Sequence, residues 1–292
     1  MEPLQQLINI LLPVFIVVLC GFIYSKVSPS DISVANKLNM NLFVPVLIFS
    51  VMASKDFQIL NYLGVLAAGV FIVLFSGVVA LPVVRMMGLQ WRTFLPPMMF
   101  NNIGNLGIPI IVLTFGESVL PLAIVLFMVE NLLHFTVGMK MLNPRANFVR
   151  VLRVPIVVAS LLGMSFSLLG WHLPQTIQIS TDMMGQISIP LMLFALGVRI
   201  SNVDFREWRI GVIGGVMSPL TGLCGVAIIA LLFDLPEDWL GVLIIFACLP
   251  PAIMNYMVAE IFNQEPHKVA SIVMTGNLMS LVILPIVLLT VV

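Results

Sequence analysis

The chain has 292 residues, of which 60% are hydrophobic and only 9% charged, and its net charge at neutral pH is zero. A soluble domain carries about 25% charged residues, so this composition excludes a mainly water-facing surface and predicts an integral membrane protein. The absence of excess positive charge argues against a nucleic-acid partner.

The first apolar run lies close to the N-terminus and follows the residues MEPLQQL, which lack the basic segment of a signal peptide. We therefore expect this run to be retained as a membrane span. Three cysteines, Cys20, Cys224 and Cys248, fall inside apolar runs and are interpreted as small buried hydrophobic residues. No spacing typical of a metal site is found, and we expect no metal and no cofactor.

Apolar runs of spanning length recur along the whole chain. A transmembrane helix needs about 20 mostly apolar residues, whereas the strand alternation of a membrane barrel is absent. The predicted fold is therefore an all-α membrane protein. Dividing the chain at its polar clusters predicts ten spans, at residues 5–25, 35–54, 60–86, 94–114, 118–140, 154–170, 176–199, 209–233, 239–262 and 268–291.

The basic residues predict the orientation. Of the 13 Lys and Arg residues, only Lys55 falls in a loop on one side of the predicted membrane. By the positive-inside rule the opposite side is cytoplasmic, and both termini, Met1 and Val292, then lie outside. The twelve residues on the cytoplasmic side are Lys26, Lys37, Arg85, Arg92, Lys140, Arg145, Arg150, Arg153, Arg199, Arg206, Arg209 and Lys268.

The two halves resemble each other at several places in the same order. NLFVPVLIFSV at 41–51 aligns with QISIPLMLFAL at 186–196, and LPPMMFNN at 95–102 aligns with LPPAIMNY at 249–256. An odd number of spans in each half would insert the halves in opposite directions, as in many secondary transporters. The predicted organisation is a repeat at 1–140, a short cytoplasmic linker at 141–153 and a second repeat at 154–292; shared composition without common ancestry is the alternative.

The fourth and ninth predicted spans each contain helix breakers, most densely in FLPPMMFNNIGNLGIPI at 94–110. Proline and glycine should divide each span into half-helices, and freed backbone groups persist in a membrane only inside protein or against a wet cavity. Matching breaks in an inverted repeat predict a substrate site near the membrane centre. The candidate substrate-binding residues are Asn101, Asn102, Asn105, Pro251, Asn255, Tyr256, Pro45 and Pro190.

Simple structural roles are the alternative for these residues. The prolines can kink ordinary helices, and the asparagines can join neighbouring helices by hydrogen bonds. For Pro45 and Pro190, which occupy matching places in the second and seventh spans, a kink and a direct contact with substrate are both open.

Glu130 lies near the middle of the fifth predicted span, with His134 one helical turn later. A carboxylate at this depth must face protein or water. A Glu–His pair could carry a proton, a carboxylate with neighbouring amides could bind sodium through oxygen, and a purely structural pairing is the alternative. Glu260 is either a site residue or a charge at the membrane boundary. The candidate ion-coupling residues are Glu130, Asn131, His134, Glu260 and Asn277.

Two segments, FNNIGNLGIPI at 100–110 and PPAIMNYMVAEIFNQEPHKVAS at 250–271, resemble bacterial members of the auxin efflux carrier family. The resemblance runs through all ten predicted spans. It implies two inverted five-helix repeats with broken helices 4 and 9 that cross, a fold related to the bile-acid/sodium symporters. It also implies a homodimer and small carboxylate substrates such as malate or malonate.

These observations together predict a secondary active transporter of small organic anions in the cytoplasmic membrane, coupled to H⁺ or Na⁺ or to neither. The resemblance implies that spans 1, 2, 6 and 7 are rigid while spans 3, 4, 5, 8, 9 and 10 carry the site. A ligand-binding receptor without transport is the alternative, against which stands the lack of a soluble signalling domain. We expect no enzyme, because His134 has no Ser or Cys at helical spacing.

Overall fold

The computed structural model describes residues 3–28, 32–144, 148–201 and 207–291. Arg145, Arg206 and the terminal residues Met1 and Val292, on which part of the predicted orientation depends, lie outside these ranges. Within them the secondary structure is helical, and the only β-type pairing described is one isolated bridge. The prediction of an all-α membrane protein is confirmed.

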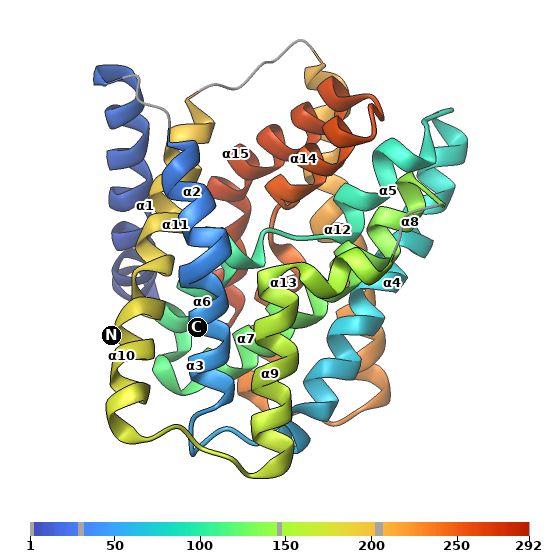
Figure 1. Ribbon diagram of the computed structural model, residues 1–292. Helices are drawn as coiled ribbons and strands as arrows, with labels where there is room; N and C mark the ends of the chain where they lie inside the picture. Colours follow the sequence, from blue (N-terminus) through green and yellow to red (C-terminus); the bar gives the residue numbers. More distant parts are fainter. Residues whose placement is uncertain (1–2, 29–31, 145–147, 202–206, 292) are drawn as a thin grey trace.

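The helices follow one another along the chain with short connections (Figure 1). The α-helices are α1 (Pro3–Val27), α2 (Ser33–Leu38), α3 (Val44–Met52), α4 (Leu63–Met86), α5 (Trp91–Met99), α6 (Ile108–Phe115), α7 (Leu120–Leu133), α8 (Met139–Leu142), α9 (Pro155–Leu169), α10 (Gln175–Gln186), α11 (Ser188–Ile200), α12 (Trp208–Leu232), α13 (Glu237–Cys248), α14 (Ile253–Ile261) and α15 (Pro266–Val291). Wider π-turns form η1 (Asn39–Phe43), η3 (Ile103–Gly107) and η5 (His134–Gly138), and tighter 3₁₀ turns form η2 (Ile59–Tyr62), η4 (Glu117–Val119) and η6 (Phe148–Arg153).

Several of these elements join into helical runs long and apolar enough to cross a membrane. In the described ranges there are seven such runs: Leu7–Val27, Ser33–Met52, Ile59–Met86, Glu117–Leu142, Gln175–Ile200, Trp208–Leu232 and Pro266–Val291. The remaining apolar helices are shorter: two of the predicted spans are interrupted, and α9 has only 15 residues. The protein is a multi-pass membrane protein, and the count of ten spans stays a prediction.

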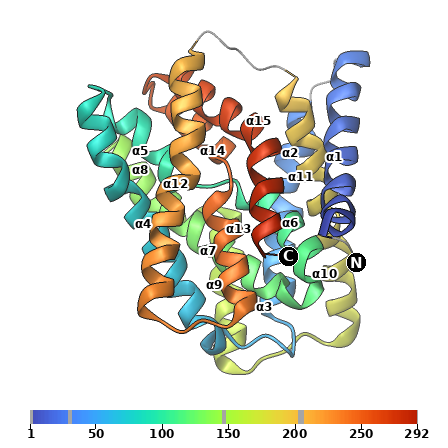
Figure 2. The ribbon, with the colours of Figure 1, turned by 180° about the vertical axis from the view of Figure 1, so that it is seen from behind.

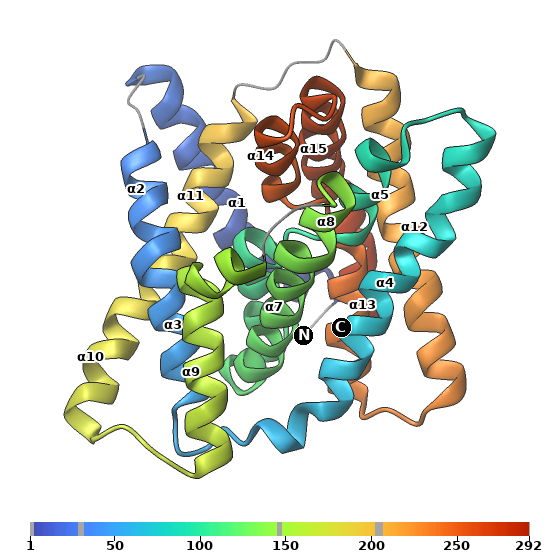
Figure 3. The ribbon, with the colours of Figure 1, turned by 45° about the vertical axis from the view of Figure 1, so that its right-hand side comes forward.

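The helices gather into two groups (Figure 3). In the first, here called the scaffold group, α1 packs along α11 and α3 packs against α9 and α10. In the second, here called the crossing group, α12 packs along α15, α4 and α13, and α4 packs along α5 and α7. The view from behind shows the same division, with α12 and α1 at opposite sides (Figure 2).

Glycine allows the closest contact within the scaffold group. A Cβ atom on Gly197 of α11 would lie 1.9 Å from the carbonyl oxygen of Val18 in α1. A Cβ atom on Gly21 of α1 would lie 2.1 Å from the carbonyl oxygen of Phe194 in α11. Any larger residue at either position would force the two backbones apart, so these glycines fix the separation of the two helices.

The connections separate toward two ends of the molecule. The loops that follow α3, α9 and α12 lie at one end, and the turn between α14 and α15 lies at the other, together with the C-terminal ends of α1 and α11 (Figure 1). Lys55 belongs to the loop after α3, whereas Lys26 and Arg199 are in the last turns of α1 and α11. We call this second end the basic end; that it faces the cytoplasm stays a prediction.

Candidate functional site: a crossing of two interrupted helices

Two helical segments end abruptly in the interior of the protein. α5 ends at Met99 and η3 begins at Ile103, while α13 ends at Cys248 and α14 begins at Ile253. The second interruption has a local cause: Leu249 and Pro250 each precede a proline, and the residue before proline avoids the helical conformation. At the first interruption Phe100 is extended, with φ −109° and ψ 111°.

The two interruptions pair with each other. The backbone N–H of Asn102 donates to the carbonyl of Pro250 at 2.7 Å, and the N–H of Ala252 donates to the carbonyl of Phe100 at 2.9 Å. Between them Asn101 and Pro251 form the isolated antiparallel bridge. Figure 1 shows the extended segment after α5 passing through the middle of the molecule. Backbone groups freed by one break are thus satisfied by the other, as a membrane interior requires.

Asparagine side chains clamp this crossing. Asn255 Nδ2 donates to the carbonyl of Phe100 at 2.9 Å, and Asn101 Nδ2 donates to the carbonyl of Phe246 at 2.9 Å. Asn102 Nδ2 donates to Asn277 Oδ1 at 2.8 Å. Since these donors are occupied by protein acceptors, the asparagines hold the crossing together in this arrangement.

A cavity of about 700 Å³ reaches the crossing. It extends from Asn101 and Asn102 to Ser33 and Lys37 in α2 and to Arg199 in the last turn of α11, at the basic end. Apolar side chains of the wall include Phe127, Ile156, Met192, Met254 and Met257. A second cavity, of about 730 Å³, lies among the loops after α3 and α9 and the start of α7, and no residue of the crossing lines it. The crossing therefore opens toward the basic end.

Unbonded N–H groups face the first cavity. Residues Ile103, Gly104 and Asn105 begin η3, and Ile253 and Met254 begin α14; all five line the cavity. Among the described residues no acceptor is hydrogen-bonded to their backbone N–H groups. The first N–H groups of a helix carry partial positive charge and attract anions. Two half-helices from different breaks therefore offer anion-binding donors to one cavity.

Unbonded oxygen atoms belong to other residues that line the same cavity. Both carboxylate oxygens of Glu130, Oδ1 of Asn101 and Oδ1 of Asn39 are buried and, within the described ranges, have no hydrogen-bond partner. The N–H of Asn101 lies near the Glu130 carboxylate without the geometry of a hydrogen bond. Glu130 is only 3% exposed. A set of acceptors without donors suits a proton on the carboxylate or a cation bound by oxygen.

His134 does not hydrogen-bond with Glu130, although it lies one turn away on the same helix face. Its ring stacks on Phe100, with the ring centroids 4.3 Å apart and the planes at 10°. The imidazole thus supports the first extended segment. Asn131 also lines the cavity, and its Nδ2 donates to the carbonyl of Phe127 at 2.7 Å.

The other candidate residues fall into two sets. Pro251, Asn255 and Asn277 lie in the crossing or bind it from α15, but they do not line the cavity. Four more lie away from the cavity walls: Pro45, Pro190, Tyr256 and Glu260. Pro45 is buried at the start of α3, and Pro190 is exposed in α11. The hydroxyl of Tyr256 donates to the exposed Glu260 at 3.1 Å. The helical run from Ser33 to Met52 continues through Pro45, with the π-turn η1 just before it.

Polar residues outside the candidate lists also line the cavity, among them Asn39, Lys37 and Arg199. The pattern of basic residues predicts that Lys37 and Arg199 lie in loops on the cytoplasmic side. A usable signal was present for Arg199, because Met192, Ala195 and Arg199 follow the spacing i, i+3, i+7 of one helix face and all three line the cavity.

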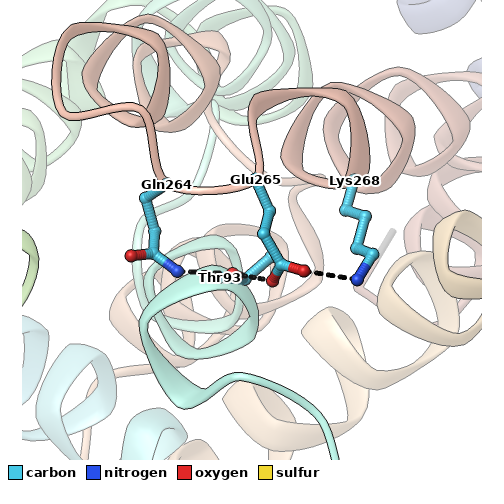
Figure 4. Close-up of polar contacts among 4 residues, drawn as sticks. All are labelled: Thr93, Gln264, Glu265 and Lys268. Carbon is cyan, nitrogen blue, oxygen red and sulfur yellow. Dashed lines mark hydrogen bonds and ion pairs between the residues drawn. The ribbon is translucent and has the colours of Figure 1, made fainter.

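At the basic end the half-helix before the first break is tied to the chain after the second. Thr93 Oγ1 in α5 donates to Glu265 Oε2 at 2.5 Å, Gln264 Nε2 donates to Thr93 Oγ1 at 3.0 Å, and Lys268 pairs with Glu265 (Figure 4). Asn263 and Glu265 adopt positive φ angles of 51° and 40° in this turn. The contacts make α5, α14 and α15 one unit around the crossing.

Comparison with known proteins agrees with this architecture. A family model described as a membrane transport protein matches residues 6–151 and residues 146–288. The chain belongs to this family. The match confirms the resemblance to the auxin efflux carrier family that the two motif segments carry.

One curated relative is similar over part of its length. It is a protein of Rhizobium meliloti (strain 1021) that bears the name "Putative malonate transporter", and it is 22% identical to this chain over 197 residues. The aligned part is 62% of this chain and 61% of the relative, so the chain spans about three fifths of that protein's length.

Proposed function

We propose that the protein is a secondary active transporter of small organic anions, carboxylates such as malate or malonate, with its substrate site at the crossing. The observation that carries the proposal is the convergence of two helix N-termini, those of η3 and α14, on one cavity. Free N–H groups there can bind a carboxylate without a buried basic side chain. Membership in the transport family and the name of the Rhizobium relative support a small anion as cargo.

The proposed membrane fold has ten spans in two inverted five-helix repeats. The seven long runs supply seven of them, and α5 with α6, α9, and α13 with α14 supply the others. In this arrangement α5–α6 and α13–α14 are the broken fourth and ninth spans. The two matches to the family model, which meet at residues 146–151, support a boundary between halves in the proposed linker.

Alternating access would move the crossing group against the scaffold group. The crossing is reached from the basic end in the present arrangement, and the second cavity lies at the opposite end without contact to the crossing. Sliding or rocking of α4–α8 and α12–α15 past α1–α3 and α9–α11 would expose the site to that second end. Broken helices that move as one unit are the usual means of such transport.

Coupling to H⁺ or Na⁺ would occur at Glu130. Its carboxylate and the free Oδ1 atoms of Asn101 and Asn39 are unpartnered oxygens of residues that line the same cavity. Asn101 belongs to both the crossing and this set of oxygens. Binding of an ion at Glu130 would therefore change the affinity for substrate at the crossing, and the reverse. Charge neutralisation of Glu130 would also remove repulsion of an anionic substrate.

The proposed location is the cytoplasmic membrane, with the basic end inside. In a chain without native cysteines, Lys55→Cys should react with an impermeant thiol reagent from outside the cell, and Lys140→Cys only from inside. The opposite labelling pattern would reverse the proposed orientation.

Counterflow in proteoliposomes tests transport itself. Vesicles loaded with unlabelled malonate should accumulate labelled malonate from outside, because exchange needs only alternating access. A receptor would bind malonate without counterflow. Protein that binds malonate but gives no counterflow above empty vesicles would support the receptor and contradict the proposal.

A further inference from the structure

Arg199 is placed unlike the other cationic side chains. It lies in the last turn of α11, is partly buried and lines the cavity that leads to the crossing. In the described part of the chain no carboxylate, carbonyl or aromatic ring partners it. Elsewhere, Lys26 donates to the carbonyl of Ser201 at 2.9 Å, Lys268 pairs with Glu265, and Arg209 lies over the ring of Trp208.

A partly buried guanidinium without a partner is costly, because its charge has lost water and gained nothing in exchange. The cavity around it contains two cations, Arg199 and the exposed Lys37, and one acid, Glu130, which forms no ion pair with either. The excess of positive charge is suited to an anion from outside the chain.

The position of α11 brings this cation to the cavity that the anion-binding donors also line. α11 packs against η3, whose first N–H groups face the same cavity. The part of the cavity wall that α11 supplies also includes Met192 and Ala195, which are apolar. The cavity therefore has anion-binding groups on separate elements together with an apolar surface.

We propose that Arg199 binds one carboxylate of a dicarboxylate while the N–H groups of η3 and α14 bind the other. The inference rests on the proposed function and adds a specificity-determining residue to it. A guanidinium can donate two parallel hydrogen bonds to a carboxylate, which gives directional recognition. Because α11 belongs to the scaffold group, this contact exists when the cavity is open at the basic end, and Arg199 sets affinity on that side.

Calorimetric titration of purified protein with malonate and with propionate tests the inference, since propionate has the same carbon count and a single carboxylate. We expect Arg199→Gln to weaken malonate binding by about tenfold or more and to leave propionate binding unchanged. Arg209→Gln removes a cation outside the cavity and should bind both acids as wild type does.

Retained propionate binding also shows that Arg199→Gln is folded. If that variant does not fold, Arg199→Lys is the second test, because lysine keeps the charge but lacks the planar guanidinium. This variant should still bind malonate more weakly relative to propionate than the wild type does. An unchanged ratio of the two affinities in the folded variant would overturn the role of Arg199. Wild-type protein that binds neither acid would instead contradict the proposed function, so the two failures are distinguishable.

Discussion

Asn102 donates its side-chain amide to Oδ1 of Asn277, although the two residues are 175 positions apart in the chain. Asn277 in turn donates to the carbonyl of Pro251 at 3.0 Å and to that of Val273 at 2.8 Å. One buried amide on α15 thus binds the first break through Asn102 and the second through Pro251. The relative position of the two breaks depends on this side chain.

Replacing Asn277 by leucine should destabilise the protein. The change keeps the branched shape of the side chain but leaves the Asn102 amide and the Pro251 carbonyl buried without this partner, and each such group costs about 1–3 kcal/mol. Denaturant unfolding in detergent measures the loss. Ser280→Ala is the matched control on the same helix, because its hydroxyl donates only to the carbonyl of Asn277 at 2.7 Å, within the same helix. Equal stability of the two variants would show that Asn277 does not hold the crossing.

Glu130→Gln tests the coupling site. Glutamine retains the size of the side chain but can neither release a proton nor carry charge. We expect malonate exchange to persist, since exchange needs no net ion movement, while accumulation driven by an ion gradient is lost. Malonate uptake into proteoliposomes is measured once under a pH gradient and once under a sodium gradient. The gradient that drives uptake by the wild type but not by Glu130→Gln identifies the coupled ion.

Glu237→Gln is the control for this experiment, because Glu237 is exposed in the first turn of α13, away from the cavity. Uptake by Glu130→Gln equal to wild type under both gradients would remove Glu130 from coupling. Glu260 would then be the remaining acidic candidate.

The Glu265 cluster should make stability depend on pH in the acidic range. Burial alone would raise the pKa of Glu265, but the hydrogen bonds from Lys268 and Thr93 and the Lys268 charge outweigh it, so the pKa lies below its ordinary value of 4.5. A lowered pKa contributes stability that is present above the ordinary value and is lost as the pH falls through the lowered one.

We therefore expect the midpoint of thermal unfolding of wild type to exceed that of Glu265→Gln at neutral pH. The difference should narrow as the pH falls below 4.5. A difference that stays constant from neutral pH to the most acidic pH tolerated would show that the Glu265 charge does not support this turn.

Gly197→Ala should destabilise the scaffold group. Alanine in a helix is normally favoured over glycine by about 1 kcal/mol. Here the added methyl group would overlap the carbonyl oxygen of Val18, and relieving such overpacking costs about 1–3 kcal/mol or more. Gly64→Ala is the control, since its methyl group would meet only the side chain of Trp239 at 3.0 Å. A Gly197→Ala variant as stable as the control would contradict the close contact of α1 with α11.

Local chemistry determined which parts of this architecture the sequence could predict. The breaks were recognisable because consecutive prolines and nearby glycines occur in otherwise apolar spans. α13 ends just before Leu249 and Pro250, which precede prolines, whereas Pro96 and Pro97 lie inside α5 and the first break follows only at Phe100. Spacing likewise placed Glu130 and His134 on one face. It could not show that the His134 ring turns to Phe100, because that choice depends on a segment distant in sequence.

Tertiary relationships were not recoverable from the local pattern. The hydrogen bond between Asn102 and Asn277 depends on how α15 packs behind the crossing. The sequence predicts a surface charge at Arg199 because this residue ends an apolar run, whereas the end of α11 borders the cavity. Seven helical runs of the described ranges reach spanning length, three fewer than the ten predicted spans, because breaks shorten two of the spans and the unbroken α9 has only 15 residues.

The central claim is that substrate binds at the crossing, and the affinity for labelled malonate of three alanine variants tests it most directly. Asn101→Ala and Asn255→Ala each remove a hydrogen bond that positions the crossing, and Asn9→Ala removes an exposed amide in α1. A site at the crossing predicts that the first two variants bind malonate about tenfold more weakly or worse, while Asn9→Ala binds as wild type does. Wild-type affinity in both Asn101→Ala and Asn255→Ala would contradict a site at the crossing.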